Sequence, residues 1–302
     1  MDLVVATPAF LDLTFIGLES LPALGQERFA GDLVRSPGGG AITAIAAARL
    51  GLRTALAAPL GDDQMGDLVA SALEHEGVTV AGARAGRTPQ TLVMPVGEER
   101  AMITVDPGVR AREADIAALA PVAVAASLDQ LHLVPDGAHA YVTCGDDDAR
   151  AFAHKPPATI GRARALFLDR QDALLLTGAS ALDQALSQLA DLVETVVVGQ
   201  GGHGSLAVRG GQRIQTPDFD TGPVVDTTGD CDLRCAAYAW ADLRGAEPDE
   251  CLAWAHLYAK LATTVPTATR GAVTHDRLLE EGTQRGLAPP GVSEPSGRAP
   301  TR

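Results

Sequence analysis

Short apolar runs alternate along the chain with stretches whose apolar residues recur every three or four positions. The runs that predict buried strands lie at residues 3–9, 54–60, 165–168 and 194–198. Helical periodicity covers residues 41–50, 66–75, 179–193, 230–243 and 248–263. This alternation is typical of a mostly parallel sheet with helices on both faces, so the predicted fold class is α/β with a doubly wound sheet.

Two segments interrupt the alternation and predict a small separate sheet. Residues 10–33 follow no helical period, and residues 91–105 read TLVMPVG and ERAMITV around a Gly97-Glu98 turn, the pattern of a β-hairpin. A hairpin inserted among strand–helix units predicts a lid, formed by residues 10–33 and 87–108. A second hairpin is predicted at residues 205–216.

The domain organisation follows from the same pattern. We expect residues 1–283 to form one domain together with its lid, because α/β folds of this length often form a single core. The segment from residue 284 to residue 302 is rich in Pro, Gly and Ser without apolar periodicity, which predicts a disordered tail.

Charge and composition narrow the possible partners and location. The net charge of −14 would repel a phosphate backbone, so nucleic acid is not an expected partner. The sequence shows no signal peptide and no run of about 18 apolar residues, so we expect a cytoplasmic protein without a membrane anchor. The four cysteines lack a CxxC spacing, which favours buried thiols over a metal site or a disulfide framework.

The first candidate binding segment is SPGGGAITAIAAARLG, residues 36–51. Gly38, Gly39 and Gly40 precede a helix and would let a ligand approach the backbone and the free N–H groups of the helix start. The alternative is a tight turn packed on a helix, and this segment alone does not decide. A dinucleotide fingerprint would need glycine where Thr43 stands, and the chain contains no GxxxxGK[ST] motif.

The second candidate segment is VVDTTGDCDLRCAAYAW, residues 224–240. An apolar strand end followed by hydroxyls, a glycine turn and a helix start predicts an anion site. Asp232 lies in the first helical turn, where it could act as general base on a substrate hydroxyl. Asp226 or Asp232 could instead cap the helix, and the segment leaves both interpretations open.

Taken in order, these segments resemble the ribokinase-like (PfkB) carbohydrate kinase family from about residue 3 to residue 273. PGGG…AAARLG followed by APLGDDQMG is similar to the family's N-terminal signature, and RTPQTLVMPVGEER to its lid hairpin. LFLDRQDALLLTG resembles an Asn-x-x-Glu segment, and VVVGQGGHGSLAV a TLGxxG stretch. DTTGDCD stands where DTTGAGD is expected.

The resemblance implies an open sheet with a β lid, ATP and Mg²⁺, room for a monovalent cation, and the hydroxyl of a sugar-like small molecule as acceptor. It also assigns roles. Asp232 becomes the catalytic base. The anion hole and its phosphate-binding neighbours are Asp226, Thr227, Thr228, Gly229, Asp230 and Cys231. By the same resemblance, the nucleotide pocket is lined by Gly199, Gly201 and Gly204. The substrate pocket is lined by Asp12, Gly38, Gly39 and Gly40. The water network around Mg²⁺ is bound by Asp169 and Asp172.

Several positions depart from the family pattern. Ile42 replaces an Asn and cannot hydrogen-bond a sugar hydroxyl, which predicts an altered acceptor. Asp169 and Asp172 replace Asn and Glu, and they could still hold a hydrated Mg²⁺. Gly199 and Gln200 replace Thr-Leu, which removes one hydroxyl contact to the nucleotide.

The largest departure lies in the anion hole, where Asp230 and Cys231 replace Ala and Gly and Arg234 replaces a large apolar residue. Two like charges about 4 Å apart cost about 4 kcal/mol at an effective dielectric of 20, so Asp230 would oppose an arriving phosphoryl group. The i, i+4 spacing of Asp230 and Arg234 allows an ion pair that draws the carboxylate away. Two functions therefore stay open, an active kinase and a kinase-fold protein that binds without efficient transfer; a homodimer that joins two lids also stays open.

Overall fold

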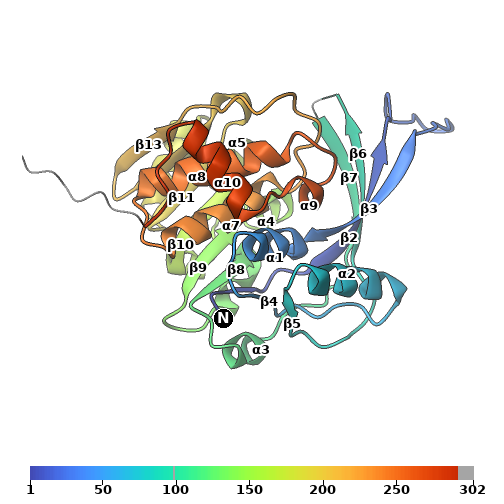
Figure 1. The fold of residues 1–302 in the computed structure, drawn as a ribbon, viewed down its shortest axis with the longest axis horizontal. Helices are drawn as coiled ribbons and strands as arrows, with labels where there is room; N and C mark the ends of the chain where they lie inside the picture. The colour runs from blue at the N-terminus through green and yellow to red at the C-terminus, as the bar shows by residue number, and fades with distance from the viewer. Residues whose placement is uncertain (98, 292–302) are drawn as a thin grey trace, which may run out of the picture.

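The computed structural model describes residues 1–97 and 99–291. Its larger sheet has nine strands in the order β13-β12-β11-β10-β9-β8-β1-β4-β5 (Figure 1). The strands β11, β10, β9, β8, β1, β4 and β5 run parallel to one another. The hairpin of β12 and β13 completes the sheet, with β12 antiparallel to β11. The strand bounds are β1 Leu3–Val5, β4 Thr54–Leu56, β5 Thr79–Val80, β8 Ala123–Ser127, β9 His139–Thr143, β10 Ala163–Asp169, β11 Thr195–Gly199, β12 Ser205–Arg209 and β13 Gln212–Thr216.

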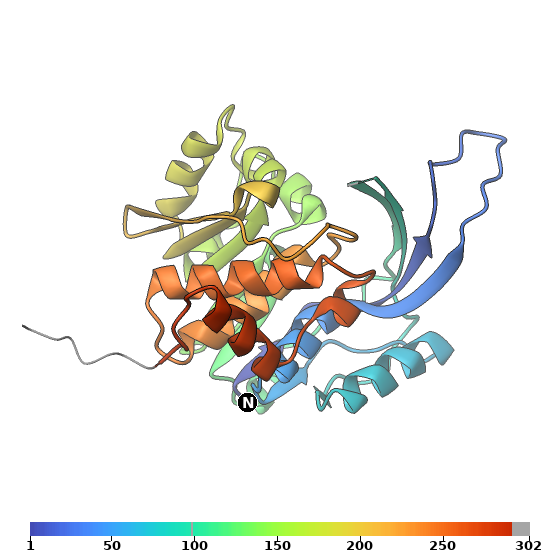
Figure 2. The same ribbon diagram turned by 45° about the horizontal axis from the view of Figure 1, so that its top comes forward.

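Helices cover both faces of this sheet, as the alternating pattern predicts (Figure 2). One face carries α1 Gly40–Arg49, α2 Gln64–His75, α7 Asp230–Asp242, α8 Pro248–Ala262, α9 Ala268–Gly271 and α10 His275–Gln284. The other carries α4 Asp146–Ala151, α5 Arg170–Thr177 and α6 Leu182–Ala190. The connections between the strands and these helices contain the short helix α3 Glu113–Ala118 and the 3₁₀ turns η1 Leu128–Leu133, η2 Ala158–Arg162 and η3 Gly201–His203.

The lid is a separate sheet of four strands in the order β3-β2-β6-β7. Its strands are β2 Ala9–Ile16, β3 Asp32–Gly39, β6 Gln90–Val96 and β7 Glu99–Val105. Two antiparallel pairs flank one parallel pair, β2 with β6. Figure 2 shows this curved sheet at one end of the body, with the loop between β2 and β3 reaching outward. The sheet therefore lies where the predicted lid segments meet.

The single strand predicted over residues 3–9 is wrong, because that run serves two sheets. β1 ends at Val5 and belongs to the large sheet, whereas β2 begins at Ala9 and belongs to the lid. Pro8 lies between them, and a proline lacks the N–H that a continuous central strand would need. The break turns the chain from the body into the lid.

The predicted tail begins inside ordered structure. α10 ends at Gln284, after which the Leu287 N–H donates to the Gly282 carbonyl (2.9 Å) and Trp254 Nε1 donates to the Ala288 carbonyl (3.1 Å). The packed chain thus continues past residue 284. The rest of the predicted tail, residues 292–302, lies outside the described residues.

Candidate active site at the start of helix α7

The carboxyl ends of three parallel strands meet the amino end of α7. Asp169 at the end of β10 pairs in register with Gly199 at the end of β11, and β9 ends on the other side of β10. Open α/β sheets bind ligands at this edge, where loops follow the strands. The residues that the sequence assigns to metal, nucleotide and phosphate therefore come from neighbouring loops.

Helix α7 begins at a glycine in the left-handed conformation. Gly229 has φ 74°, and its N-cap position has no side-chain hydrogen bond. A Cβ at Gly229 would lie 2.8 Å from Ala268 Cβ and 2.9 Å from Ile42 Cδ1, so only glycine fits this turn. Neither Asp226 nor Asp232 caps α7. The Asp230 N–H donates to the Thr227 carbonyl at 3.4 Å, and the N–H groups of Cys231 and Asp232 have no capping side chain and can bind an anion.

Asp232 is half-buried in the first turn of α7 and held by α1. The Thr43 hydroxyl donates to Asp232 Oδ1 at 3.0 Å. Burial raises the pKa of Asp232 to about 7, the Thr43 hydrogen bond acts against this rise, and the charge of Asp230 adds to it. A carboxyl group with a pKa near neutrality can both accept and release a proton under physiological conditions.

A second carboxylate reaches the same place from the lid. Asp12 on β2 is 6% exposed, and its pKa is raised to about 7 by burial and by the charges of Asp232 and Asp226. Asp12 is distant in sequence from both of these acids, yet their charges act on its carboxyl group where the lid meets the body. Two carboxyl groups with raised pKa values in one place, those of Asp12 and Asp232, are characteristic of functional sites.

The glycine run before α1 makes room for this arrangement. A Cβ at Gly38 would lie 2.1 Å from Asp12 Oδ1, one at Gly39 2.3 Å from the Phe10 ring, and one at Gly40 2.2 Å from the Thr7 carbonyl oxygen. Tight packing, the alternative interpretation of this run, therefore accounts for Gly39 and Gly40. Gly38 serves the site more directly, because it lets the Asp12 carboxylate lie against the backbone.

Asp226 organises the loop in front of α7. Its carboxylate accepts hydrogen bonds from the backbone N–H groups of Thr228 and Thr267, both at 2.8 Å. Thr267 has φ 68°, a conformation that costs roughly 1–3 kcal/mol in a residue other than glycine and is concentrated at functional sites. On the lid side, Arg100 Nη1 of β7 donates to the Thr227 hydroxyl (2.5 Å). The loop is thus held from both body and lid.

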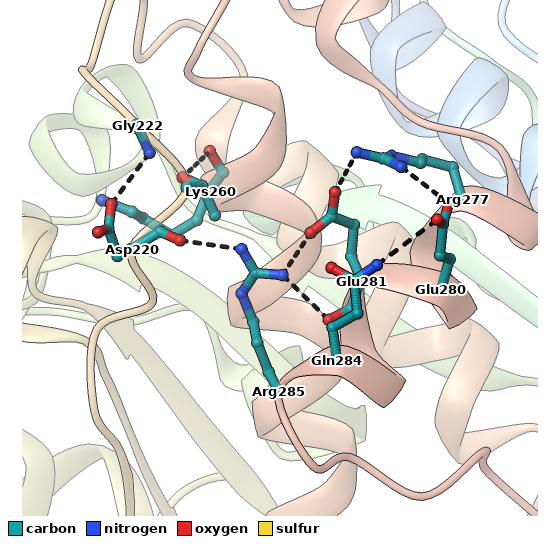
Figure 3. A network of polar contacts seen from close by, with 9 residues as sticks. Asp220, Gly222, Lys260, Arg277, Glu280, Glu281, Gln284 and Arg285 are labelled. Carbon is teal, nitrogen blue, oxygen red and sulfur yellow. Dashed lines mark hydrogen bonds and ion pairs between the residues drawn. The ribbon is translucent and has the colours of Figure 1, made fainter.

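The segment leading to this loop is tied to the helices behind it (Figure 3). Arg285 Nη2 donates to the Asp220 carbonyl at 2.9 Å, and the Arg285 guanidinium also pairs with Glu281. Thr221 Oγ1 donates to the Lys260 carbonyl at 3.2 Å. α8 and α10 therefore fix residues 220–221, which limits how the loop before α7 can move.

The three glycines assigned to the nucleotide have different surroundings. A Cβ at Gly201 would meet nothing within 4 Å, and its φ of 57° favours glycine. A Cβ at Gly204 would lie 2.0 Å from the Thr216 carbonyl oxygen, so this glycine allows β12 and β13 to pair. Gly199 faces inward, toward Arg234. Of the three, only Gly201 has open space around it.

Asp169 and Asp172 stand together at the start of α5. Asp169 is exposed and its Oδ1 accepts from the Asp172 N–H at 2.8 Å, so it caps the helix. Burial and the nearby Asp169 charge raise the pKa of Asp172 to about 7. No three His, Cys, Asp or Glu side chains within residues 1–97 and 99–291 are arranged to hold a metal ion.

The ion pair between the unexpected residues of α7 is present. Asp230 Oδ2 and Arg234 Nη2 lie 2.6 Å apart, with the Arg234 side chain only 3% exposed. Cys231 is helical with no positive φ, so it imposes no backbone strain. Ile42 is buried against Gly229, beneath the turn.

Three residues of this site were not identified from the sequence: Thr43, Arg100 and Thr267. Thr43 follows the glycine run by one helical turn, so its position offered a signal. Arg100 and Thr267 reach the site only through the folding of distant segments, and no local pattern marks them.

Comparisons with known proteins agree with this arrangement. A sequence model of the pfkB family of carbohydrate kinases matches residues 22–275. The chain belongs to this family. A relative of this pfkB-family protein is acarbose 7(IV)-phosphotransferase from an Actinoplanes species, 25% identical over 251 residues that cover 76% of this chain and 81% of that protein.

Solved structures with the same fold include two ribokinases. The Thermotoga maritima enzyme matches with a TM-score of 0.78 at 18% identity, over 92% of this chain and 98% of that chain. The Arabidopsis thaliana enzyme, solved with ribose and ATP, matches with a TM-score of 0.75 at 25% identity, over 92% and 97%. The predicted ribokinase-like fold is confirmed. In the part of the chain that the structure describes, no helix has the length and apolarity to cross a membrane.

Proposed function

We propose that this pfkB-family protein is an ATP-dependent kinase that transfers the γ-phosphoryl group to a hydroxyl of a sugar or sugar-like small molecule. The proposal rests on the place of Asp232 in the first turn of α7, where its carboxylate accepts a hydrogen bond from the Thr43 hydroxyl at 3.0 Å and burial raises its pKa to about 7. General bases work best when their pKa is close to the working pH. Asp232 takes the proton of the acceptor hydroxyl as its oxygen attacks phosphorus.

The surroundings of Asp232 suit the negative charge that develops during transfer. Gly229 places no capping side chain on the N–H groups of Cys231 and Asp232, and such donors stabilise a phosphoryl group without having to reorganise. Thr227 adds a hydroxyl to this loop, and the Thr228 N–H is held by Asp226. Arg100 brings a positive charge from the lid to Thr227. Phosphoryl transfer depends mainly on positioning and charge stabilisation, which these groups supply.

The acceptor is proposed to bind between lid and body. Asp12 offers buried carboxylate oxygens to hydroxyl groups, and Gly38, Gly39 and Gly40 form the backbone beside it. Ile42 adds no polar group, so fewer hydroxyls are recognised on that side. The name of the Actinoplanes relative indicates a sugar derivative as its substrate, which supports the same chemical class here.

The donor is proposed to lie along Gly199, Gly201 and Gly204, with ATP supplying the phosphoryl group. The open, left-handed Gly201 fits a phosphate chain that approaches the backbone closely. Asp169 and Asp172 would hold the water shell of Mg²⁺, whose charge would also relieve the repulsion between these two acids.

A monovalent cation fits beside the Asp226 carboxylate. The hydroxyl oxygens of Thr228 and Thr267 are buried there without a hydrogen-bond partner among the described residues. Both residues also donate their backbone N–H groups to Asp226, so one carboxylate anchors both of them. Oxygen ligands of this kind are those that hard cations prefer.

The lid also suggests how the protein associates. Large apolar side chains are exposed on its strands and outer loop: Leu21, Leu24, Phe29, Leu33, Met102, Ile103 and Val105. Exposed apolar clusters often mark interaction surfaces, so we propose a homodimer in which two lids meet. The proposed use of ATP and the net charge of −14 accord with a cytoplasmic protein that binds no nucleic acid.

The second candidate function is binding of nucleotide or sugar without efficient transfer. Asp230 favours it, because this acid occupies the first turn of α7 where a phosphoryl group would arrive. The two functions differ in turnover and not in fold.

The test is ADP release from ATP and Mg²⁺ with a panel of sugars, aminosugars, nucleosides and sugar phosphates. We expect at least one acceptor to stimulate ADP release, and Asp232→Asn to lower kcat about a hundredfold or more. Asp183→Asn, a change at an exposed acid paired with Arg213, is the matched control and should leave turnover unchanged. ADP binding without any stimulated turnover would favour the second candidate.

A further inference from the structure

Three departures from the family pattern come together in space. Asp230 and Arg234 form their ion pair along the side of α7, at 2.6 Å. Gly199, at the end of β11, lies directly over the guanidinium, since a Cβ there would be 2.3 Å from Arg234 Nη1 and 2.8 Å from Nη2. A Thr at this position would therefore exclude the Arg234 side chain from the space it occupies.

Arg234 depends on Asp230 for its charge balance. The residue is 2% exposed, and its Nε and Nη1 atoms are buried without a hydrogen-bond partner within residues 1–97 and 99–291. Among the described residues, Asp230 is the only acid paired with it. A buried cation that loses its counterion is strongly destabilising, so the two side chains hold each other in place.

The pair also determines where the Asp230 carboxylate lies. Asp230 is the first residue of α7, next to the uncapped N–H groups that attract anions. A carboxylate without a partner at this position would turn toward those N–H groups and compete with a phosphate. Arg234, one turn further along, instead holds it on the flank of the helix.

We infer that Arg234 is a positioning residue that holds Asp230 away from the anion site, and that Gly199 is glycine because Arg234 needs its space. The inference rests on the proposed function, since it explains how the same site accepts a phosphoryl group despite an added acid. Asp230, Arg234 and Gly199 then form one unit, in which changing one member alone is harmful and changing a matched second member repairs it.

The first test measures ADP affinity by titration calorimetry in Arg234→Met and in Arg234→Met with Asp230→Asn. A carboxylate about 6–9 Å from an anion at an effective dielectric of about 20 weakens binding roughly 20- to 100-fold, so the single variant should lose affinity within that range. The double variant should recover to within about threefold of the parent. A role in packing alone would not give this recovery, because the second change restores no packing.

Gly199→Ala provides an independent route to the same state. Its methyl group displaces the guanidinium without touching Asp230, so ADP affinity should fall as in Arg234→Met, and Asp230→Asn should again restore it. This variant keeps the inference testable if Arg234→Met does not fold.

The matched control is Arg164→Met. Arg164 pairs with Asp242 at the other end of α7, with Nε and Oδ2 2.5 Å apart. This change should lower the unfolding midpoint while ADP affinity stays at the parent value, because the pair lies far from the anion site.

Parent-like ADP affinity in folded Arg234→Met, or no recovery in the double variant, would overturn the inference. A parent that binds no ADP would instead contradict the proposed function. In that case the inference is tested by a double-mutant cycle of Asp230 and Arg234, measured on the equilibrium constant of unfolding. The coupling factor between the two residues should be at least about tenfold, and Gly199→Ala should abolish it. Additive effects of the two substitutions on the free energy of unfolding would refute the inference that Asp230, Arg234 and Gly199 act as one unit.

Discussion

The hydrogen bond from Thr43 to Asp232 offers a sharp test of how the base is tuned. Thr43→Val removes the hydroxyl and keeps the shape of the side chain, at a site where Thr43 Oγ1 lies 3.0 Å from Asp232 Oδ1. This bond stabilises the ionised carboxylate and acts against burial, which raises the pKa of Asp232 to about 7. Its loss should therefore raise that pKa further.

The size of the effect follows from the charged acceptor. A hydrogen bond to a charged group contributes about 1.5–3 kcal/mol, and about 1.4 kcal/mol corresponds to one pKa unit. The pKa of Asp232 should rise by about one to two units. At pH 7 the ionised fraction should fall from about one half to between about 1% and 10%, which lowers the rate roughly 5- to 50-fold.

The assay is the pH dependence of kcat for ADP release between pH 6 and pH 10. The acidic limb should move to higher pH in Thr43→Val, and the two enzymes should converge near pH 10, where Asp232 is ionised in both. Thr54→Val is the matched control, because Thr54 is buried but donates to the Leu52 carbonyl, away from the site. A uniform loss at every pH, with the limb unmoved, would refute the tuning role of Thr43.

Three further predictions concern stability, the lid and the anion hole. The free energy of unfolding in urea should rise when the pH is lowered from 8 to 6.5. In this range four carboxyl groups with pKa values raised to about 7 bind protons in the folded chain but not in the unfolded chain: Asp12, Asp148, Asp172 and Asp232. A stability that does not change with pH would contradict these raised pKa values. Amides in residues 10–33 and 87–108 should exchange slowly only with substrate bound, and equal protection without it would indicate a rigid cap. Asp230→Ala with Cys231→Gly leaves Arg234 buried and unpaired, so urea unfolding should show lower stability, which Arg234→Met should restore. The kcat for ADP release should stay near the parent value in the triple variant, because Arg234 already holds Asp230 away from the anion site; a large rise in kcat would contradict this.

Much of the fold was predictable because its signals are local. The helical period over residues 230–243 and 248–263 matches α7 and α8 closely, and both hairpins form where turn residues interrupt the alternation. β8 and β9 were not identified, because their short runs, AVAAS and HAYVT, lack a clear strand period. The strand predicted over residues 3–9 failed for a topological reason, since two sheets share it.

The site was predictable only in part, because its geometry is set by contacts distant in sequence. The i, i+4 spacing sufficed to predict the ion pair of Asp230 and Arg234, and the structure confirms it. The burial of Arg234 beneath Gly199 could not be predicted, since it depends on the packing of β11 against α7. The hydrogen bond between Thr43 and Asp232 likewise joins residues 189 positions apart.

The most direct test of the central claim is transfer of labelled phosphate from γ-³²P-ATP to an acceptor, measured side by side for the parent and Asp232→Asn. ADP binding by both proteins is measured in parallel as the control for an intact nucleotide site. We expect a labelled sugar or sugar derivative with the parent, about a hundredfold less with Asp232→Asn, and equal ADP affinity in both. Equal labelling by the two proteins, or no labelled product from a parent that binds ADP, would contradict the role of Asp232 as the base of a kinase.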